Sequence, residues 1–214
     1  MAGDVKIYSF RNTDFFSCNV IVISSPKGVL VIDPGYYDKE GRNYIRTLGQ
    51  VDAILLTHGH WDHIFGLQAI CADFPDTPVY LFRGQTAFLT DTVLNCSEPQ
   101  KFDVIVDVDT TELDEGIAEI AGYTIEVIHT PGHVEGCCMY YFPDEGFLVA
   151  GDTVLETMFG TTFRPTGSAE RLKQTAQMLL DRDFPESMPC YPGHGNSTDF
   201  AHLKKVLQTK EEIT

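Results

Sequence analysis

A buried strand that ends in a run of metal-binding side chains constrains this sequence more than any other feature. Residues 51–56 form an almost continuous apolar run, as in a strand covered on both faces, and it is followed directly by Thr57-His58-Gly59-His60-Trp61-Asp62-His63. In extended chain, His58 and His60 project to the same side. Asp62 and His63 come where the next helix is expected to begin. The segment therefore predicts that four metal-capable side chains enter one small volume.

Three later segments each carry a histidine or an aspartate just past the end of an expected strand. They hold His133, Asp152 and His194, each preceded by a glycine that permits a tight turn. Any one of them alone is more typical of an ordinary turn or surface position. Loops at strand ends are where α/β sites assemble. The four segments together therefore predict a metal site.

The donor set contains five histidines and two aspartates, with no obligatory thiolate. Imidazole and carboxylate suit Zn²⁺, Fe or Mn²⁺. Seven donors are too many for one tetrahedral ion. We therefore expect two divalent metal ions, zinc being favoured, about 3.5–4 Å apart and sharing a carboxylate and a water. The expected donors are His58, His60, Asp62, His63, His133, Asp152 and His194.

The rest of the sequence alternates strand-like runs with helical periods. No Ser/Gly-rich linker divides it, so we expect one domain over residues 1–214, with two stacked sheets flanked by helices. The expected strands are residues 5–10, 19–24, 28–32, 51–56, 79–82, 103–108, 123–128, 137–142, 147–150 and 188–191. The expected helices are residues 39–48, 67–74 and 85–94, and two that follow caps at Ser168 and at Thr198 or Asp199.

Charge and composition exclude several classes of function. With 15 basic and 31 acidic residues the net charge is −16, which disfavours a nucleic-acid partner. The longest apolar run has six residues, where a membrane span needs about 20, so no membrane partner is expected. No Sec-type signal is visible and the six cysteines are taken as reduced, which predicts a cytoplasmic protein with a small-molecule substrate. The sequence leaves the oligomeric state open. Seven carboxylates between Lys101 and Ile120 predict a solvated acidic face.

These segments resemble the motifs of the metallo-β-lactamase-fold hydrolases. The H-x-H-x-D-H pattern of that family is matched by residues 58–63. Four further motifs match in family order, namely Val31-Ile32-Asp33-Pro34-Gly35, His129-Thr130-Pro131-Gly132-His133, Gly151-Asp152-Thr153 and Pro192-Gly193-His194-Gly195. The resemblance implies an α/β protein built as a four-layer αββα sandwich, with the metals at one edge between the sheets. It also implies a first metal held by His58, His60 and His133, a second held by Asp62, His63 and His194, and Asp152 bridging both.

Within that superfamily the chain looks most like the glyoxalase II (hydroxyacylglutathione hydrolase) group. Asp152 stands where zinc β-lactamases commonly place a cysteine, and His60 stands where the diiron flavoprotein branch has glutamate. We therefore expect a dinuclear metal-dependent hydrolase in which a metal-bridging hydroxide attacks the carbonyl of a small thioester. Asp62, which can orient the hydroxide, and Asp152 are the expected catalytic residues. The alternatives are a non-haem iron persulfide dioxygenase, a lactone hydrolase on the same fold, and a metal-binding protein without turnover.

Substrate recognition is expected to differ from that of the glyoxalase II group. A chain of 214 residues leaves no room for the separate helical glutathione-binding domain of that group. Residues 159–165 also lack its Gly-Arg-Thr/Ser-type segment. The acidic charge disfavours strongly anionic ligands unless Arg164 or nearby lysines supply a local clamp. We therefore expect small acyl thioesters as substrates and weak recognition of glutathione.

A few other residues carry weaker expectations. Asp33 is either a turn residue before Pro34 or a residue that orients a ligating imidazole, and the sequence favours neither. His129 and His202 are expected not to bind metal. Trp61 is expected at the pocket rim, with packing in the core as the alternative. Met158, Phe159 and Phe163 are expected to form either an apolar substrate wall or a plain loop plug.

Overall fold

The computed structural model describes residues 6–10, for their backbone only, and residues 18–214. Its strands form two six-stranded sheets. The first sheet has the order β1 (Lys6–Phe10), β2 (Val20–Ser25), β3 (Gly28–Ile32), β4 (Ala53–Leu56), β5 (Val79–Phe82) and β6 (Thr111–Leu113). The second has the order β12 (Thr198–Asp199), β11 (Pro189–Pro192), β10 (Phe147–Gly151), β9 (Cys138–Phe142), β8 (Tyr123–His129) and β7 (Gly116–Ile120).

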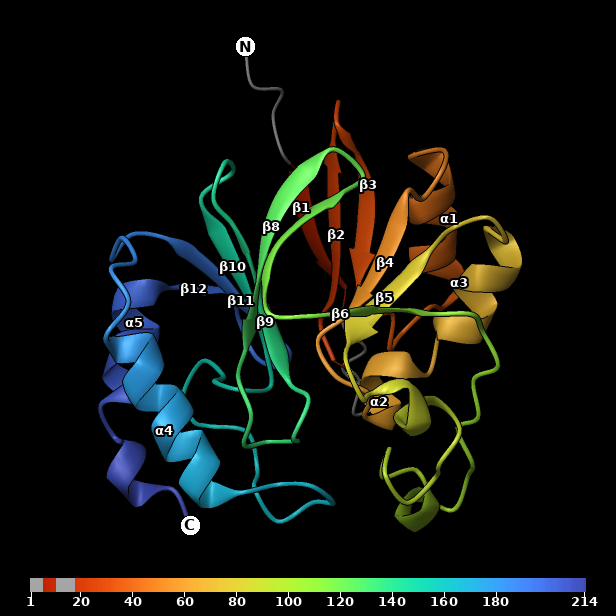
Figure 1. The fold of residues 1–214 in the computed structure, drawn as a ribbon. Helices are drawn as coiled ribbons and strands as arrows, with labels where there is room; N and C mark the ends of the chain where they lie inside the picture. Colours follow the sequence, from red (N-terminus) through yellow and green to blue (C-terminus); the bar gives the residue numbers. More distant parts are fainter. Residues whose placement is uncertain (1–5, 11–17) are drawn as a thin grey trace.

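Helices cover the outer face of each sheet (Figure 1). Three pack on the first sheet, namely α1 (Lys39–Thr47), α2 (Trp61–Ile64) and α3 (Leu67–Asp73). Two pack on the second, namely α4 (Ala169–Leu180) and α5 (Phe200–Leu207). Helices α4 and α5 begin at side-chain caps, because Ser168 Oγ accepts from Arg171 N and Asp199 Oδ1 accepts from His202 N. The predicted four-layer αββα sandwich is confirmed.

Alternation along the strands builds three apolar layers between these four. In β3, Val31 faces α1 and α3, whereas Leu30 and Ile32 face the second sheet, because neighbouring residues of a strand point to opposite faces. The layer between the sheets includes the fully buried Tyr123 and Tyr140. Burying a large apolar side chain contributes about 1.5–3 kcal/mol. The three layers therefore fix the position of the two sheets relative to each other. The loops at the shared edge of the sheets are held in place for the same reason.

Strand direction brings one set of ends together. Strands β3, β4 and β5 are mutually parallel. In the second sheet β10 is parallel to β11, and β8 runs the same way as β10 because each is antiparallel to β9. The loops that follow these strands carry every segment in which the sequence predicts a metal-binding residue. The topology thus places those segments at strand ends, as expected.

Two expected elements are corrected by the structure. Residues 103–108 form no strand: Val104 and Val106 are buried, but the Val106 amide donates to Leu89 O and the Val104 amide to Ser97 Oγ. The segment is extended without a partner strand, which periodicity cannot reveal. Of the helix expected at 85–94, only the 3₁₀ turn Thr86–Leu89 forms, because the Asp91 carboxylate binds the next backbone amides in a turn.

The short strands β6 and β7, which the sequence analysis did not identify, lie within the acidic segment. All seven carboxylates between Lys101 and Ile120 are exposed, so the predicted solvated acidic face is confirmed. All six cysteines are free thiols, as expected. Cys138 packs between the sheets, whereas the adjacent Cys137 packs against Phe88 and Val134 on the other side.

Candidate metal centre

The seven predicted donors come together at the shared edge of the two sheets. His58 follows β4, His60 is the residue before α2, and Asp62 and His63 belong to its first turn. From the second sheet, the loops after β8, β10 and β11 supply the other three, His133, Asp152 and His194.

The donors form three overlapping groups, and within each group the ligand atoms lie within 4.8 Å of one another. The groups are His58, His60 and His133; His58, His63 and Asp152; and Asp62, His63 and His194. His58 and His63 each belong to two groups, so the cluster is continuous. This arrangement offers donor groups that could hold a divalent cation.

The cluster contains buried polar atoms with no hydrogen-bond partner in the described part of the chain. They are Nε2 of His58, His60 and His63, and Oδ1 of Asp152. Each such atom costs about 1–3 kcal/mol when it is left unsatisfied. Four such atoms on neighbouring donors are the pattern that a bound cation satisfies. The cluster therefore fits divalent metal ions.

Hydrogen bonds behind three of the rings set their orientation. His58 Nδ1 lies 3.2 Å from Thr57 Oγ1, and His63 Nδ1 lies 2.9 Å from Asp33 Oδ2. His133 Nδ1 lies 2.7 Å from the carbonyl oxygen of Thr161. Each bond occupies Nδ1 and leaves Nε2 facing the cluster, as is usual for metal-binding histidines.

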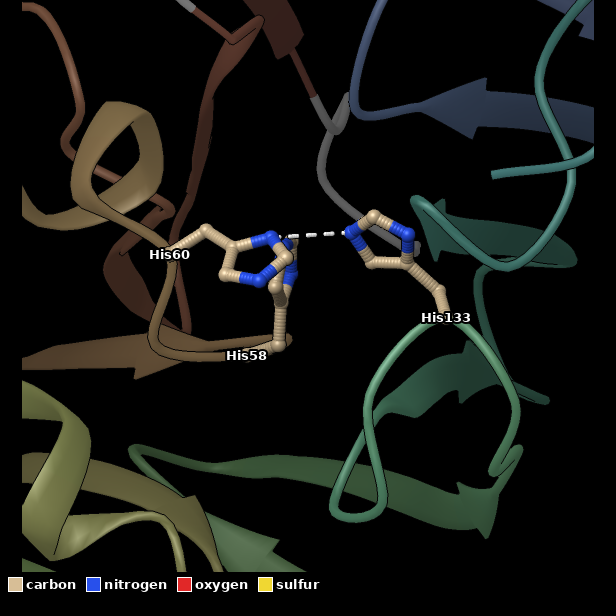
Figure 2. Close-up of side chains that lie close together, drawn as sticks. All are labelled: His58, His60 and His133. Atoms are coloured by element: carbon tan, nitrogen blue, oxygen red, sulfur yellow. Dashed lines mark hydrogen bonds between the residues drawn. The ribbon is translucent and has the colours of Figure 1, made fainter. Parts of the chain in front are cut away.

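His60 and His133 face each other across the two sheets (Figure 2). His133 Nε2 lies 2.9 Å from His60 Nδ1, so one of these nitrogens must carry a proton to bridge them. Two nitrogen ligands at 2.0–2.1 Å from a tetrahedral ion lie about 3.3 Å apart. The spacing of the two nitrogens is therefore close to the spacing that a shared ion requires.

Electrostatics divide the histidines of the cluster into two classes. Burial, together with the neighbouring imidazoles, lowers the pKa of His58 well below its usual value and that of His60 to about 3. Burial also lowers the pKa of His133. Burial works against protonation of His194 as well, but Asp152 and Asp62 outweigh it and raise the pKa of His194 to about 9. The three-histidine group is thus neutral and ready to donate, whereas His194 must release a proton to bind a cation.

Asp33 hydrogen-bonds to a cluster imidazole. Of the two roles left open by the sequence, it therefore has that of orienting an imidazole. Its Oδ1 accepts from the Thr57 amide at 2.7 Å, and its Oδ2 accepts from Thr57 Oγ1 at 2.6 Å as well as from His63 Nδ1. Asp33 itself has φ 51°, an unusual value for a non-glycine residue. The side chain therefore holds both the strand end and a cluster imidazole.

Three further positioning residues escaped the sequence analysis. Asn19 Nδ2 donates to the carbonyl oxygens of Pro192 and Gly195, at 2.9 and 3.0 Å, and so fixes the loop that carries His194. Gln85 Oε1 accepts from the Gly59 amide at 3.2 Å, between His58 and His60. Thr57 links Asp33 to the strand end. The position of Asn19 directly before an apolar run was the one available signal, and it does not identify the partner.

Close packing explains one glycine in the cluster. A Cβ on Gly193 would lie 2.1 Å from Asp152 Oδ1 and 2.8 Å from the His63 ring. Any side chain at this position would displace Asp152 or His63. The glycine before His194 is therefore required by the approach of two loops.

The two remaining described histidines lie outside the three groups. His129 stacks on Phe82 with 4.4 Å between ring centroids, and its Nε2 bonds the carbonyl oxygen of Glu135. His202 Nε2 bonds the carbonyl oxygen of Glu156 at 2.8 Å. Both bonds hold loops, and neither imidazole belongs to a donor group.

A cavity of about 750 Å³ opens beside the donors. Trp61 lines it and packs edge-to-face on Phe102, so the tryptophan stands at the pocket, as expected. Met158 and Phe159 line it too, whereas Phe163 does not and is 76% exposed. The lining residues are His60, Trp61, Asp62, Cys96, Gln100, Phe102, His133, Asp152, Leu155, Met158, Phe159, Gly160, Thr161, Arg164 and His194.

Sequence comparison places this site in a known family. The model of the metallo-beta-lactamase superfamily matches residues 13–194, which include all seven donors. The chain belongs to the metallo-beta-lactamase superfamily. The chain is 31% identical to a probable metallo-hydrolase of Streptococcus pyogenes over 208 residues, covering 94% of this chain and 89% of that protein. The family thus supports a metal-dependent hydrolase, and divalent metal ions as its cofactors.

Two more specialised relatives differ in the activity that they are named for. A hydroxyacylglutathione hydrolase of Aeromonas hydrophila is 33% identical over 162 residues, covering 75% of this chain and 56% of that protein. The crystal structure of BLEG-1 B3 metallo-beta-lactamase superposes with a TM-score of 0.81 at 29% identity, covering 93% of this chain and 95% of that chain.

Of the helices in the described residues, none is long and apolar enough to cross a membrane.

Proposed function

We propose that this protein hydrolyses a small acyl thioester with two divalent metal ions bound in the donor cluster. The observation that carries the proposal is the set of three overlapping donor groups with four unsatisfied buried donor atoms. In this proposal Asp152 bridges the two ions. The first ion is held by His58, His60 and His133, and the second by Asp62, His63 and His194.

The donor chemistry favours zinc over the other candidates. Imidazole and carboxylate ligands are those that Zn²⁺ takes in catalytic sites, and Fe or Mn²⁺ accept the same set. No thiol belongs to the three donor groups, although Cys96 lines the cavity. The proposal therefore names zinc, with iron and manganese as the ions that metal analysis must distinguish from it.

The residues of the chain determine where the reaction takes place. Bound ions supply a water whose pKa falls to about 7 and polarise the carbonyl oxygen of the substrate. Asp62 Oδ2 lies 3.1 Å from His194 Nε2 at the cavity wall, so this carboxylate is placed to accept and orient a proton there. The Thr57–Asp33–His63 hydrogen bonds keep the donors in place, so little reorganisation is required during reaction.

The cavity supports a small acyl thioester as the substrate. Its walls are largely apolar, with Trp61, Phe102, Leu155 and Met158 lining the same cavity as the donors. Such walls bind an acyl chain and exclude water from the carbonyl. The relative named a hydroxyacylglutathione hydrolase supports thioester chemistry. The proposal also places the protein in the cytoplasm with a small-molecule partner, on its net charge of −16 and its six free thiols.

A second candidate is hydrolysis of β-lactam amides. The observation in its favour is the likeness to BLEG-1 B3 metallo-beta-lactamase over 95% of that chain. A β-lactam carbonyl presents the same kind of electrophile, activated by ring strain. The thioester remains the first candidate because Asp152 occupies a position where zinc β-lactamases commonly have a cysteine.

The experiment is a set of parallel assays on the metal-loaded protein after metal analysis. The substrates are a short acyl thioester of a neutral thiol, a chromogenic cephalosporin, a simple lactone, and a persulfide with oxygen uptake as readout. His129→Ala serves as the active control and His133→Ala as the inactive one. We expect thioester hydrolysis to exceed the other activities. Faster cephalosporin or lactone turnover, oxygen uptake, or no turnover at full metal occupancy would each reject the thioester assignment.

A further inference from the structure

Arg164 differs from every other arginine whose side chain the structure describes. Five of these six arginines pair with carboxylates, at Asp73, Asp114, Glu126 and Glu135. Arg164 has no carboxylate within ion-pairing distance among the described residues, in a chain with 31 acidic side chains. Arg164 is only partly buried, so its side chain is open to a partner from solution.

Arg164 also stands at the cavity beside the donor cluster. It is the only lysine or arginine among the described residues that line this cavity. The apolar walls formed by Trp61, Phe102 and Met158 belong to the same cavity. The two carboxylates in the lining, Asp62 and Asp152, are each within 3.4 Å of a cluster histidine. Among the described residues that line the cavity, Arg164 is therefore the one charged residue with no ion-pair or histidine contact.

The backbone that carries Arg164 is held in a defined turn. The Gly167 amide donates to Arg164 O at 2.9 Å, with Pro165 second in the turn and Thr166 third at φ 65°. Proline at the second position and a positive φ at the third are the features of a type II turn. The guanidinium also lies 5.0 Å from the centre of the Phe163 ring, which gives that exposed phenylalanine a role in orienting it.

The turn is also tied to the cluster itself. The Glu135 amide donates to Thr166 Oγ1 at 3.1 Å, and the Ser168 amide donates to Gly132 O at 2.8 Å. Gly132 and Glu135 flank His133. The position of the Arg164 backbone is therefore fixed relative to a cluster donor. A fixed backbone lets a binding residue select ligands by the distance between their charged group and their reacting carbonyl.

We propose that Arg164 binds a carboxylate of the substrate and thereby selects anionic thioesters, which rests on the function proposed above. A guanidinium binds a carboxylate with two parallel hydrogen bonds, so it recognises both the charge and the orientation of that group. The substrate class is a thioester with an apolar segment and one carboxylate, in which the apolar segment packs on the aromatic wall. The carboxylate belongs either to the acyl group or to the thiol.

Matched pairs of thioesters test this proposal. For the acyl group, the glutaryl and 5-methylhexanoyl thioesters of N-acetylcysteamine differ only by carboxylate against isopropyl. For the thiol, butanoyl thioesters of 3-mercaptopropionate and 3-methylbutane-1-thiol differ in the same way. We expect the wild-type kcat/KM to favour the carboxylate at least tenfold in one pair, mainly through KM. Arg164→Gln should abolish that preference, and Arg164→Lys should retain part of it.

Arg171→Gln is the matched control, because Arg171 is exposed, pairs with Glu135 and does not line the cavity. It should keep the wild-type preference. A preference that survives in Arg164→Gln, or none in wild type, would overturn the proposal.

Calorimetry with uncleavable thioether analogues of the four esters separates this inference from the proposed function. If no thioester is cleaved, the proposed function fails. Tenfold tighter binding of a carboxylated thioether that is lost in Arg164→Gln would still support the arginine site, and equal binding by both proteins would reject it.

Discussion

Asp33 and His63, thirty positions apart in the sequence, are joined by a hydrogen bond of 2.9 Å between Oδ2 and Nδ1. The same carboxylate binds both the amide and the hydroxyl of Thr57. One buried side chain thus fixes the end of β4 and the ring of a proposed ligand. This bond shows how the first sheet orients one of the proposed ligands.

The Asp33 bond predicts a loss of metal affinity without a lost ligand. Asp33→Asn removes the charge behind His63, so we expect metal affinity to fall about 10–100-fold. Competition with a chromogenic chelator measures this directly. Asp52→Asn is the control, because Asp52 Oδ2 also accepts from a backbone amide, that of Val29, away from the cluster. Unchanged affinity in Asp33→Asn would show that the bond serves only the fold.

Asp152 is expected to bridge the two ions. Replacing it with alanine removes the shared carboxylate and leaves two cations poorly screened from each other. We expect Asp152→Ala to lose at least one ion per chain and to lower kcat by at least about a hundredfold. Replacing a residue that only hydrogen-bonds to a metal ligand already lowers metal affinity or activity 10–100-fold. Elemental analysis and steady-state kinetics measure the two effects. Retention of both ions with full turnover would refute the bridging role.

The described histidines divide into expected metal ligands and residues that are expected not to bind metal. His60→Ala and His133→Ala should lower the metal content, because each belongs to a donor group. His129→Ala and His202→Ala should keep the full content, because their Nε2 atoms bond backbone carbonyls instead. Elemental analysis of the four purified variants decides the matter. Stoichiometric loss in His129→Ala would contradict the assignment.

Recognition of glutathione is expected to be weak. The described cavity lining offers one lysine or arginine, Arg164, whereas glutathione carries two carboxylates and an ammonium group. A hydroxyacyl glutathione thioester and the same acyl group on a small neutral thiol should therefore have kcat/KM values within about tenfold. A preference for glutathione of a hundredfold or more, equal to about 2.7 kcal/mol, would restore specific glutathione binding.

A buried carboxylate far from the cluster makes stability depend on pH. Hydrogen bonds from Arg42 and Tyr37 lower the pKa of Asp73 to about 2. A carboxyl whose pKa is lower in the folded protein stabilises it above the unfolded value near 3.9, and that contribution is lost as pH falls from about 4 to 2. We expect Asp73→Asn to be less stable at neutral pH by about 1.5–3 kcal/mol.

Urea unfolding from pH 7 to pH 2 measures this difference. The gap between wild type and Asp73→Asn should narrow below pH 4. Asp183→Asn, which changes an exposed carboxylate, should match wild type throughout. A gap that is constant with pH would exclude the ionic contribution of Asp73.

The gathering of seven metal-capable side chains at one edge could be predicted from the sequence because it depends on local pattern. A buried apolar run followed by His58 and His60 marks a strand end, and a glycine beside His133, Asp152 or His194 marks a tight loop. These signals span a few residues, and strand direction then requires the loops to meet at one edge. The same local logic predicted a cap at Ser168 and one at Thr198 or Asp199; in the structure Ser168 and Asp199 each bind an amide three residues ahead.

Contacts between distant segments were decided only by the tertiary structure. Asn19 lies 173 positions from the Pro192 carbonyl that it binds, and no local pattern specifies such a pair. Residues 103–108 alternate like a strand, yet their amides bond Leu89, Ser97 and Gln68, none of which lies in a strand, because the fold leaves them no neighbouring strand. Arg164 has the residue type of an ordinary surface cation. Its lack of a carboxylate partner among the described residues and its place at the cavity arise from packing across the chain, which sequence periodicity does not encode.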